Sequence, residues 1–399
     1  MRRYETRFLD FFQKNVIFIG FFAVSILGLL LRIKLFPLET ADYSYFMKSW
    51  IDQLKEHPGI SGIGENIGEY NVPYMFFLAV IARTPFSDLY EIKGFSVLFD
   101  FIGAFAVILL LSHFQQTKLF TMENLLAYAA ILFTPVVFLN SAFWAQCDFI
   151  YVSMLLFCMY FMVKERYALS MIFFGIAFAF KLQAMFFLPV ILIYYFAAKK
   201  MRALNFLWIP VVFIIAALPA IFAGRGIVDT FTIYTKQTSI YENLTMECPN
   251  IYVFLPGDYA IFSKVGIMLT ILTLGIGACL LIHKGSMDSK EIVLLAVWST
   301  MVCIYFLPAM HERYVFIACI FSIVWAFLYH KDWWIAVGIN LVCFLSSVTY
   351  LFKVTIFDLK YLAVANLVFL IAITIRLFAR LDTESVKVMA YADNSKGQN

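Results

Sequence analysis

The chain has 399 residues, of which 63% are hydrophobic and only 14% are charged, and its mean hydropathy is +0.86. A soluble domain is about half apolar and about a quarter charged, so this composition excludes an ordinary soluble enzyme and predicts an all-α polytopic membrane protein. The 30 basic and 26 acidic residues leave a net charge of +4, too balanced for a protein that binds nucleic acid through a basic surface.

Apolar runs bounded by charged or turn residues recur along the chain. At about 20 residues for each crossing, twelve helices need about 240 residues, or about 60% of the chain, which is close to the hydrophobic fraction. The basic amino terminus and the long run after it are typical of a signal anchor. We expect one domain over residues 1–380 with about 12 transmembrane helices, at about 15–35, 94–114, 124–144, 149–163, 167–181, 184–198, 204–223, 260–283, 290–308, 313–329, 333–352 and 359–378.

A shorter apolar run at 74–82 decides the orientation of everything after it. It has about ten residues, too few to cross the hydrocarbon as a helix, so we expect a juxtamembrane helix in the first outer loop. Nearly every short basic loop is then cytoplasmic, as the positive-inside rule requires. Both termini are predicted inside, with outer loops at about 36–93 and 224–259 and a disordered cytoplasmic tail at 381–399.

This topology gathers the unusual polar residues on the outer side of the membrane. They lie in the segments TADYSYFMKSW, GEYNVPY, FWAQCDFIY, FKLQAMFFLP and FLPAMHERYVF. Ionisable residues close to hydrocarbon are costly and usually functional. The candidates are Asp42, Trp50, Tyr70, Trp144, Gln146, Asp148, Lys181, Gln183, His311, Glu312 and Arg313.

Each of these residues also has a purely structural interpretation. Asp42 could end the first helix near the headgroups, and Asp148 could cap the helix that follows it. Lys181 could extend to the interface, Glu312 could pair with its two neighbours, and the aromatic residues could form an interfacial belt. All of these interpretations would have to hold together on one face. We therefore favour an outer polar cavity in which a carboxylate acts as general base and the cations hold a leaving phosphate.

The order of these motifs resembles the GT-C class of integral-membrane glycosyltransferases, and within it the bacterial relatives of the GPI-anchor mannosyltransferase II. The family pattern has W-G-Q-x-D, K-x-Q, M-H-E-R-Y and a tyrosine-proline pair in the first loop, and the likeness covers about residues 1–320. Two positions depart from it. Ala145 stands where a glycine is expected, and Val72-Pro73 stands where a double proline is common.

The resemblance implies an inverting transferase that moves a mannose-like hexose from a polyprenyl-phosphate sugar to an acceptor hydroxyl outside the cytoplasm. The acceptor would be a glycolipid, a glycan or a protein. No cofactor is implied, no nucleotide motif is present, and a divalent metal is left open. With the richness in Phe and Ile, the resemblance favours a bacterial cytoplasmic membrane.

The resemblance also suggests a role for each candidate residue. Asp42 would be the general base, because this class is expected to carry its catalytic carboxylate in the first outer loop, and Asp148 would orient the acceptor or act as a second carboxylate. Lys181, His311 and Arg313 would bind the donor phosphate. The residues that would contact sugar or acceptor are Trp50, Tyr70, Trp144, Gln146, Gln183 and Glu312.

Two other functions remain open on the sequence. A transporter or flippase of lipid-linked saccharides would also place ionisable residues in the membrane, although the two halves of the chain show no evident repeat. An outer-face polysaccharide polymerase or ligase would use a diphosphate-linked glycan. Among the seven cysteines, Cys147 and Cys248 lie outside the apolar runs and could pair on the outer face.

Overall fold

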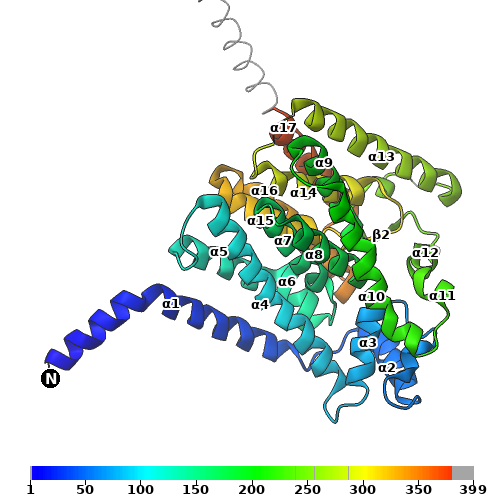
Figure 1. Ribbon diagram of the computed structural model, residues 1–399, viewed down its shortest axis with the longest axis horizontal. Coiled ribbons are helices and arrows are strands. Elements are labelled where there is room, and N and C mark those ends of the chain that lie inside the picture. The colour runs from blue at the N-terminus through cyan, green and yellow to red at the C-terminus, as the bar shows by residue number, and fades with distance from the viewer. Residues whose placement is uncertain (1, 239, 256, 286, 380–399) are drawn as a thin grey trace, which may run out of the picture. The chain divides into compact units, whose positions relative to one another are not determined.

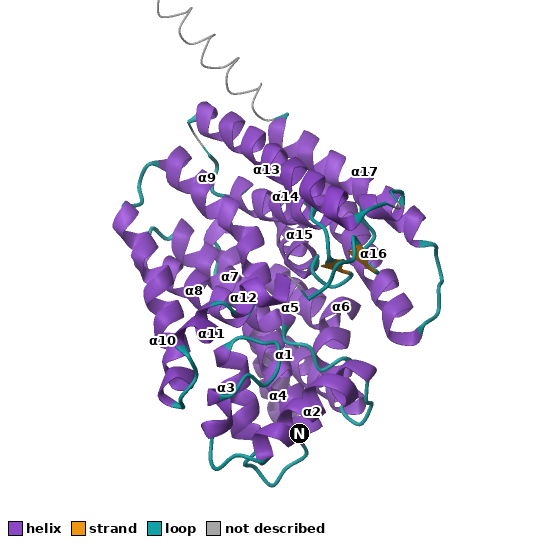
Figure 2. Ribbon diagram, turned by 90° about the vertical axis from the view of Figure 1, so that its right-hand side faces the viewer, coloured by secondary structure: helices purple, strands orange, loops and turns teal. Residues whose placement is uncertain are grey.

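The computed structural model describes residues 2–238, 240–255, 257–285 and 287–379, so the predicted tail at 381–399 lies outside the described residues. The chain divides into two compact units. Unit 1 comprises Met1–Ala184 and Arg202–Ile240, and unit 2 comprises Met185–Met201 and Tyr241–Asn399. Helices dominate both units, and Figure 2 shows one short pair of strands in orange.

Unit 1 combines long apolar helices with several short ones. In Figure 1 the long helix α1 runs away from the other helices of its unit at its N-terminal end, where residues 4–14 are exposed. The elements of unit 1 are α1 (Arg2–Leu35), η1 (Tyr43–Met47), α2 (Lys48–Lys55), η2 (Ser61–Gly64), α3 (Val72–Ile81), α4 (Asp88–Gln115), α5 (Met122–Phe133), α6 (Pro135–Phe138), η3 (Leu139–Phe143), α7 (Asp148–Val163), α8 (Tyr167–Phe180), η5 (Ala203–Leu207), α10 (Trp208–Phe222), α11 (Ile227–Phe231) and α12 (Ile233–Thr238).

Unit 2 is built around two buried helices, α14 and α15, whose side chains are nearly all enclosed. Its two strands pair in parallel, with Thr245 opposite Met310 and Met246 opposite His311. The elements of unit 2 are α9 (Leu188–Ala198), β1 (Thr245–Met246), η6 (Ile251–Val253), α13 (Tyr259–Lys284), α14 (Glu291–Phe306), β2 (Met310–His311), α15 (Phe316–Leu328), η7 (His330–Asp332), α16 (Trp333–Phe352) and α17 (Leu359–Phe378), and η4 (Leu182–Phe187) joins the two units.

All twelve apolar runs form helix, and the all-α, membrane-type fold class is confirmed. Six helices among the described residues are long and apolar enough to cross a bilayer, and a bent pair, 122–133 with 135–143, would be a seventh. The other five runs form helices shorter than the roughly 20 residues that a crossing needs. The count of twelve spans therefore stays a prediction.

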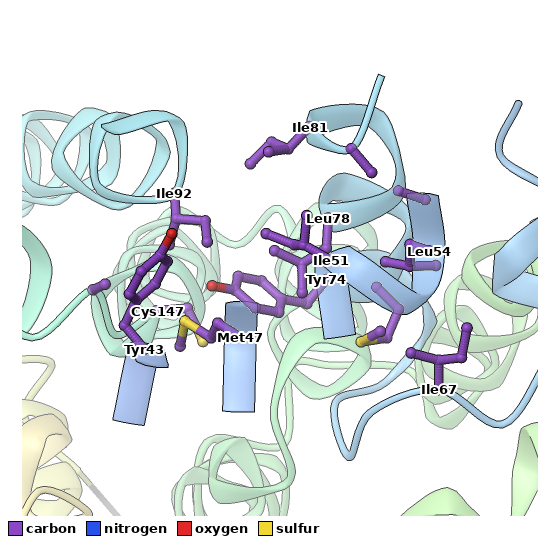
Figure 3. Close-up of a cluster of buried hydrophobic side chains, with 14 of the residues drawn as sticks. Tyr43, Met47, Ile51, Leu54, Ile67, Tyr74, Leu78, Ile81, Ile92 and Cys147 are labelled. Atoms are coloured by element: carbon purple, nitrogen blue, oxygen red, sulfur yellow. The ribbon is translucent and has the colours of Figure 1, made fainter. Parts of the chain in front are cut away.

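The short run after Pro73 forms α3, a helix of 10 residues whose start is well defined. Pro73 lies in its first turn, where a missing N–H costs nothing, and Asn71 caps it by accepting a hydrogen bond from the Val72 amide. Figure 3 shows how α3 then packs: Tyr74 and Leu78 meet Ile51 of α2 in one buried apolar cluster. The same cluster contains Tyr43, which follows Asp42, and Ala145 and Cys147, which flank Gln146.

Helices α4 and α7 approach closely at Gly103, beside the ring of Phe149. A Cβ atom at position 103 would lie 2.6 Å from two atoms of that buried ring. We expect Gly103→Val to destabilise the protein by about 1–3 kcal/mol through overpacking. Gly94→Ala, on the same helix with nothing within 4 Å of the added methyl group, is the control. Thermal unfolding in detergent measures both, and equal melting temperatures would show that this contact is not tight.

Candidate active site

Asp42 lies just before η1 and is held by the turn that leads into α7. Its Oδ2 accepts hydrogen bonds from the indole Nε1 of Trp144, at 2.8 Å, and from the amide Nε2 of Gln146, at 3.0 Å. Thr40, two residues earlier, donates to the backbone carbonyl of Trp144 at 3.3 Å. All three residues of this group, Asp42, Trp144 and Gln146, are buried. The structure therefore brings the segment around Asp42 and the WAQCD motif together.

The backbone of the WAQCD turn explains the glycine in the family pattern. Ala145 has φ 62°, in the left-handed region that glycine adopts without strain. For an L-residue this conformation costs roughly 1–2 kcal/mol. Ala145 is fully buried, so a side chain larger than a methyl group would not fit either. Alanine is thus tolerated here at a cost in stability.

Asp148 begins α7 and is completely buried. Its Oδ1 forms an ion pair with the Lys181 ammonium group at 2.5 Å, and its Oδ2 accepts a hydrogen bond from the Asn140 side chain at 2.7 Å. Asn140 also accepts a hydrogen bond from the Asp148 backbone amide. The α7 helix dipole stabilises a carboxylate in its first turn, and the α8 helix dipole stabilises a cation just after its last turn. The ion pair joins the start of α7 to the end of α8.

Tyr70 connects the group around Asp42 with the Asp148–Lys181 pair. Its hydroxyl donates to Oε1 of Gln146 at 3.1 Å, and its ring lies 5.7 Å from the Lys181 ammonium. Trp50 packs against the same ring edge to face, with the ring centroids 5.7 Å apart. These two aromatic residues therefore lie beside the side chains that surround Asp42 and Lys181.

Two amides complete the surroundings of the site. Gln183, predicted to contact sugar or phosphate, is buried, and among the described residues its Oε1 has no hydrogen-bond partner. Asn71, which the sequence analysis did not select, donates to the Ala179 carbonyl at 2.9 Å and to the Tyr234 hydroxyl at 3.2 Å. Asn71 therefore ties the start of α3 to the end of α8. Its place in the motif YNVPY was the available signal.

The second half of the predicted site lies in unit 2. Glu312 is buried, and its two carboxylate oxygens face the side chains of its neighbours: Arg313 Nη1 at 3.2 Å and His311 Nδ1 at 3.7 Å. Tyr241 packs edge to face on the His311 ring, with centroids 6.0 Å apart. The pairing within this motif is the structural alternative raised from sequence. Whether these residues join Asp42 and Lys181 in one cavity stays a prediction, because each unit is described by itself.

Cys248 follows β1 and is fully buried near Glu312. Burial raises the pKa of its thiol well above the usual value, and the nearby Glu312 carboxylate acts in the same direction. A thiol in this state is a poor nucleophile and a poor partner for oxidation. Among the described residues no cysteine forms a disulfide, so the pairing of Cys147 with Cys248 that the sequence left open is not formed.

The sequence analysis missed a buried ion pair inside the apolar helices of unit 1. Arg32 of α1 donates from Nε to Oδ2 of Asp100 on α4 at 2.7 Å, and neither side chain has any exposed area. Ser141 of η3 donates to the same oxygen at 2.5 Å. The signal was present, since both residues interrupt otherwise apolar runs and ionisable groups within such runs are seldom incidental.

The geometry of unit 1 can perform one kind of chemistry well. A carboxylate held by two neutral donors is fixed in direction and can accept a proton, while a neighbouring buried cation can stabilise negative charge. Among the described residues, no three His, Cys, Asp or Glu side chains are grouped so that they could hold a metal ion.

No family model matches the chain, and no curated protein matches it in sequence. The resemblance to the GT-C class therefore stays a prediction.

The Asp148–Lys181 pair gives a direct test of this geometry. Lys181→Met would leave a fully buried carboxylate without its cation, so we expect a loss of about 3–5 kcal/mol in stability. The double variant Asp148→Asn/Lys181→Met removes both charges and should recover most of that loss. Chemical or thermal unfolding of the purified variants measures the difference. Additive effects of the two substitutions would contradict the pairing.

Proposed function

We propose that this protein is a membrane glycosyltransferase of the GT-C type. It transfers a hexose from a polyprenyl-phosphate sugar to an acceptor hydroxyl on the outer face of the membrane, with inversion at the anomeric carbon. The observation that carries this proposal is the pair of hydrogen bonds that Trp144 and Gln146 donate to Oδ2 of Asp42. It joins the two motifs, from separate parts of the chain, that the family resemblance treats as one site.

Asp42 acts as the general base in this proposal. Inverting transfer forms one bond, from the acceptor oxygen to the anomeric carbon, and breaks one, from that carbon to the phosphate oxygen. The acceptor proton passes to Asp42, and the bonding electrons leave with the phosphate. No acid is needed, because a phosphate is a stable leaving anion. The two neutral N–H donors hold the carboxylate in place, and a positioned base of this kind contributes about 10²–10⁴-fold in rate.

The donor phosphate is bound by cations that are already paired. Lys181 and Arg313 each contact a carboxylate, Asp148 and Glu312 respectively. Pairing fixes the direction of each cation, and in this proposal further N–H groups contact the phosphate, since an ammonium has three donors and a guanidinium five. The aromatic faces of Trp50 and Tyr70 offer a stacking surface for the sugar.

The proposal includes a topology of about twelve spans with both termini in the cytoplasm. Tyr45, in η1, has 76% of its surface exposed and would face the outside, whereas Lys118, in the exposed loop after α4, would face the cytoplasm.

We expect an impermeant thiol reagent added to intact cells to label Tyr45→Cys and to leave Lys118→Cys unlabelled until the membrane is permeabilised. A Cys279→Ser background suits this test, because the other six cysteines are buried. The reverse pattern of labelling would invert the orientation and remove the site from the outer face.

Asp42→Asn tests the catalytic role. The asparagine oxygen can still accept the bonds from Trp144 and Gln146, so the fold should persist while transfer falls by about 10²-fold or more. Membranes containing the protein are incubated with radiolabelled polyprenyl-phosphate mannose, and label is followed into glycolipid, polymer and protein fractions. Asp52→Asn, at an exposed carboxylate in α2, is the control.

The outcome separates the proposals. Near-normal transfer by Asp42→Asn would remove Asp42 from the role of base. Transfer from a diphosphate-linked glycan, with none from the monophosphate sugar, would favour a polymerase or ligase instead.

One observation favours a transporter as the second candidate. Arg32 and Asp100 lie inside apolar helices, and such ionisable residues often mark a transport path. Both side chains are entirely enclosed, however, and a path requires that a solute can reach the groups along it. The transferase proposal also gives a role to Trp50 and Tyr70, which are only partly buried, and it takes precedence.

A further inference from the structure

The buried Arg32–Asp100 pair lies where three segments of unit 1 meet. Arg32 belongs to the last turns of α1, Asp100 to the middle of α4, and Ser141, which donates to Asp100, to η3. Arg32 also donates from Nη2 to the carbonyl of Leu132 at 3.0 Å. That carbonyl lies in the last turn of α5, where a helix offers no N–H to satisfy it. The ion pair and the hydrogen bonds to it therefore connect α1, α4 and the bent α5–η3 segment.

Two chain segments leave this point and meet again at Asp42. The first runs from Arg32 to the end of α1. There the Lys93 ammonium of α4 donates hydrogen bonds to the carbonyls of Leu35, Phe36 and Leu38. It then reaches Asp42. The second runs from Ser141 along η3 to the WAQCD turn, which supplies the two donors to Asp42.

We infer that Arg32 and Asp100 are positioning residues for Asp42, although neither touches it. This inference rests on the proposed function for its catalytic part only. The geometric part, that the pair holds Asp42 against Trp144, does not depend on any substrate. A shift of about 1 Å in a catalytic group can cost about 10²-fold in rate, so a remote clamp of this kind is enough to control activity.

The test removes the pair without leaving a buried charge. Arg32→Met/Asp100→Leu replaces both side chains with apolar ones, which for buried pairs is often neutral for stability. The protein is labelled with 5-fluorotryptophan, and the ¹⁹F resonance of Trp144, one of seven tryptophans, is assigned by its loss in Trp144→Phe. We expect the Trp144 resonance to shift and broaden in the double variant, and kcat to fall about 10–100-fold with KM unchanged.

A matched control comes from unit 2. There Asp332 accepts a hydrogen bond from the Trp325 indole at 3.1 Å and pairs with Arg376 at 3.0 Å. Asp332→Leu/Arg376→Met removes an acid–base pair that contacts a tryptophan, with the arginine 51% exposed, and it should move the Trp325 resonance while leaving that of Trp144 and kcat unchanged. A merely structural role for Arg32 and Asp100 would give the same result in the two double variants.

Should the double variant fail to fold, Ser141→Ala breaks only one bond of the clamp and should give a smaller change in the same direction. An unchanged Trp144 resonance in a folded variant would overturn the inference, and so would an unchanged kcat. Should the wild-type protein show no transfer at all, the proposed function fails, and the resonance alone still decides whether the pair positions Asp42.

Discussion

The constraint on which unit 1 depends is the cost of placing charge inside an apolar helical protein. An isolated buried carboxylate or ammonium is strongly unfavourable, so each must find a partner with good geometry. Asp148 pairs with Lys181, at the end of the next helix, and Asp100 of α4 pairs with Arg32 of α1. Because each charge accepts one particular arrangement of its neighbours, the pairs restrict how otherwise featureless apolar helices can pack.

The same constraint organises the backbone where the helices break. Helix α5 ends at Phe133, a short segment begins at Pro135, and the ends of these helices carry carbonyls that lipid cannot satisfy. Arg32 and Lys93 both donate to such carbonyls, at the ends of α5 and α1. The buried cations thus satisfy backbone carbonyls at the helix ends, and these carbonyls in turn stabilise the buried cations. The candidate site is assembled from the segments that emerge from these two junctions.

The sequence was sufficient for the positions of the apolar helices, because a long apolar run has few alternatives to helix in a membrane protein. It also brought Asp42 and the WAQCD motif to one site. It could not show how many helices cross, since α8 and α15 form too few turns to decide by length. Nor could it show that Lys181 is paired with Asp148. Helices α7 and α8 are consecutive, so the start of one and the end of the other can be expected to lie close, but the contact between these two side chains depends on how the helices pack.

The Arg32–Asp100 pair also has a consequence for the order in which the protein is made. The two residues are 68 positions apart in the chain. At a synthesis rate of about 5–20 residues per second, Arg32 is complete about 3–14 s before its partner exists. During that interval α1 would carry an unmatched guanidinium near the end of its apolar stretch, where a long side chain can still reach the interface. In the proposed topology, the first helix would therefore reach its final depth only when α4 enters the bilayer and brings Asp100 to Arg32.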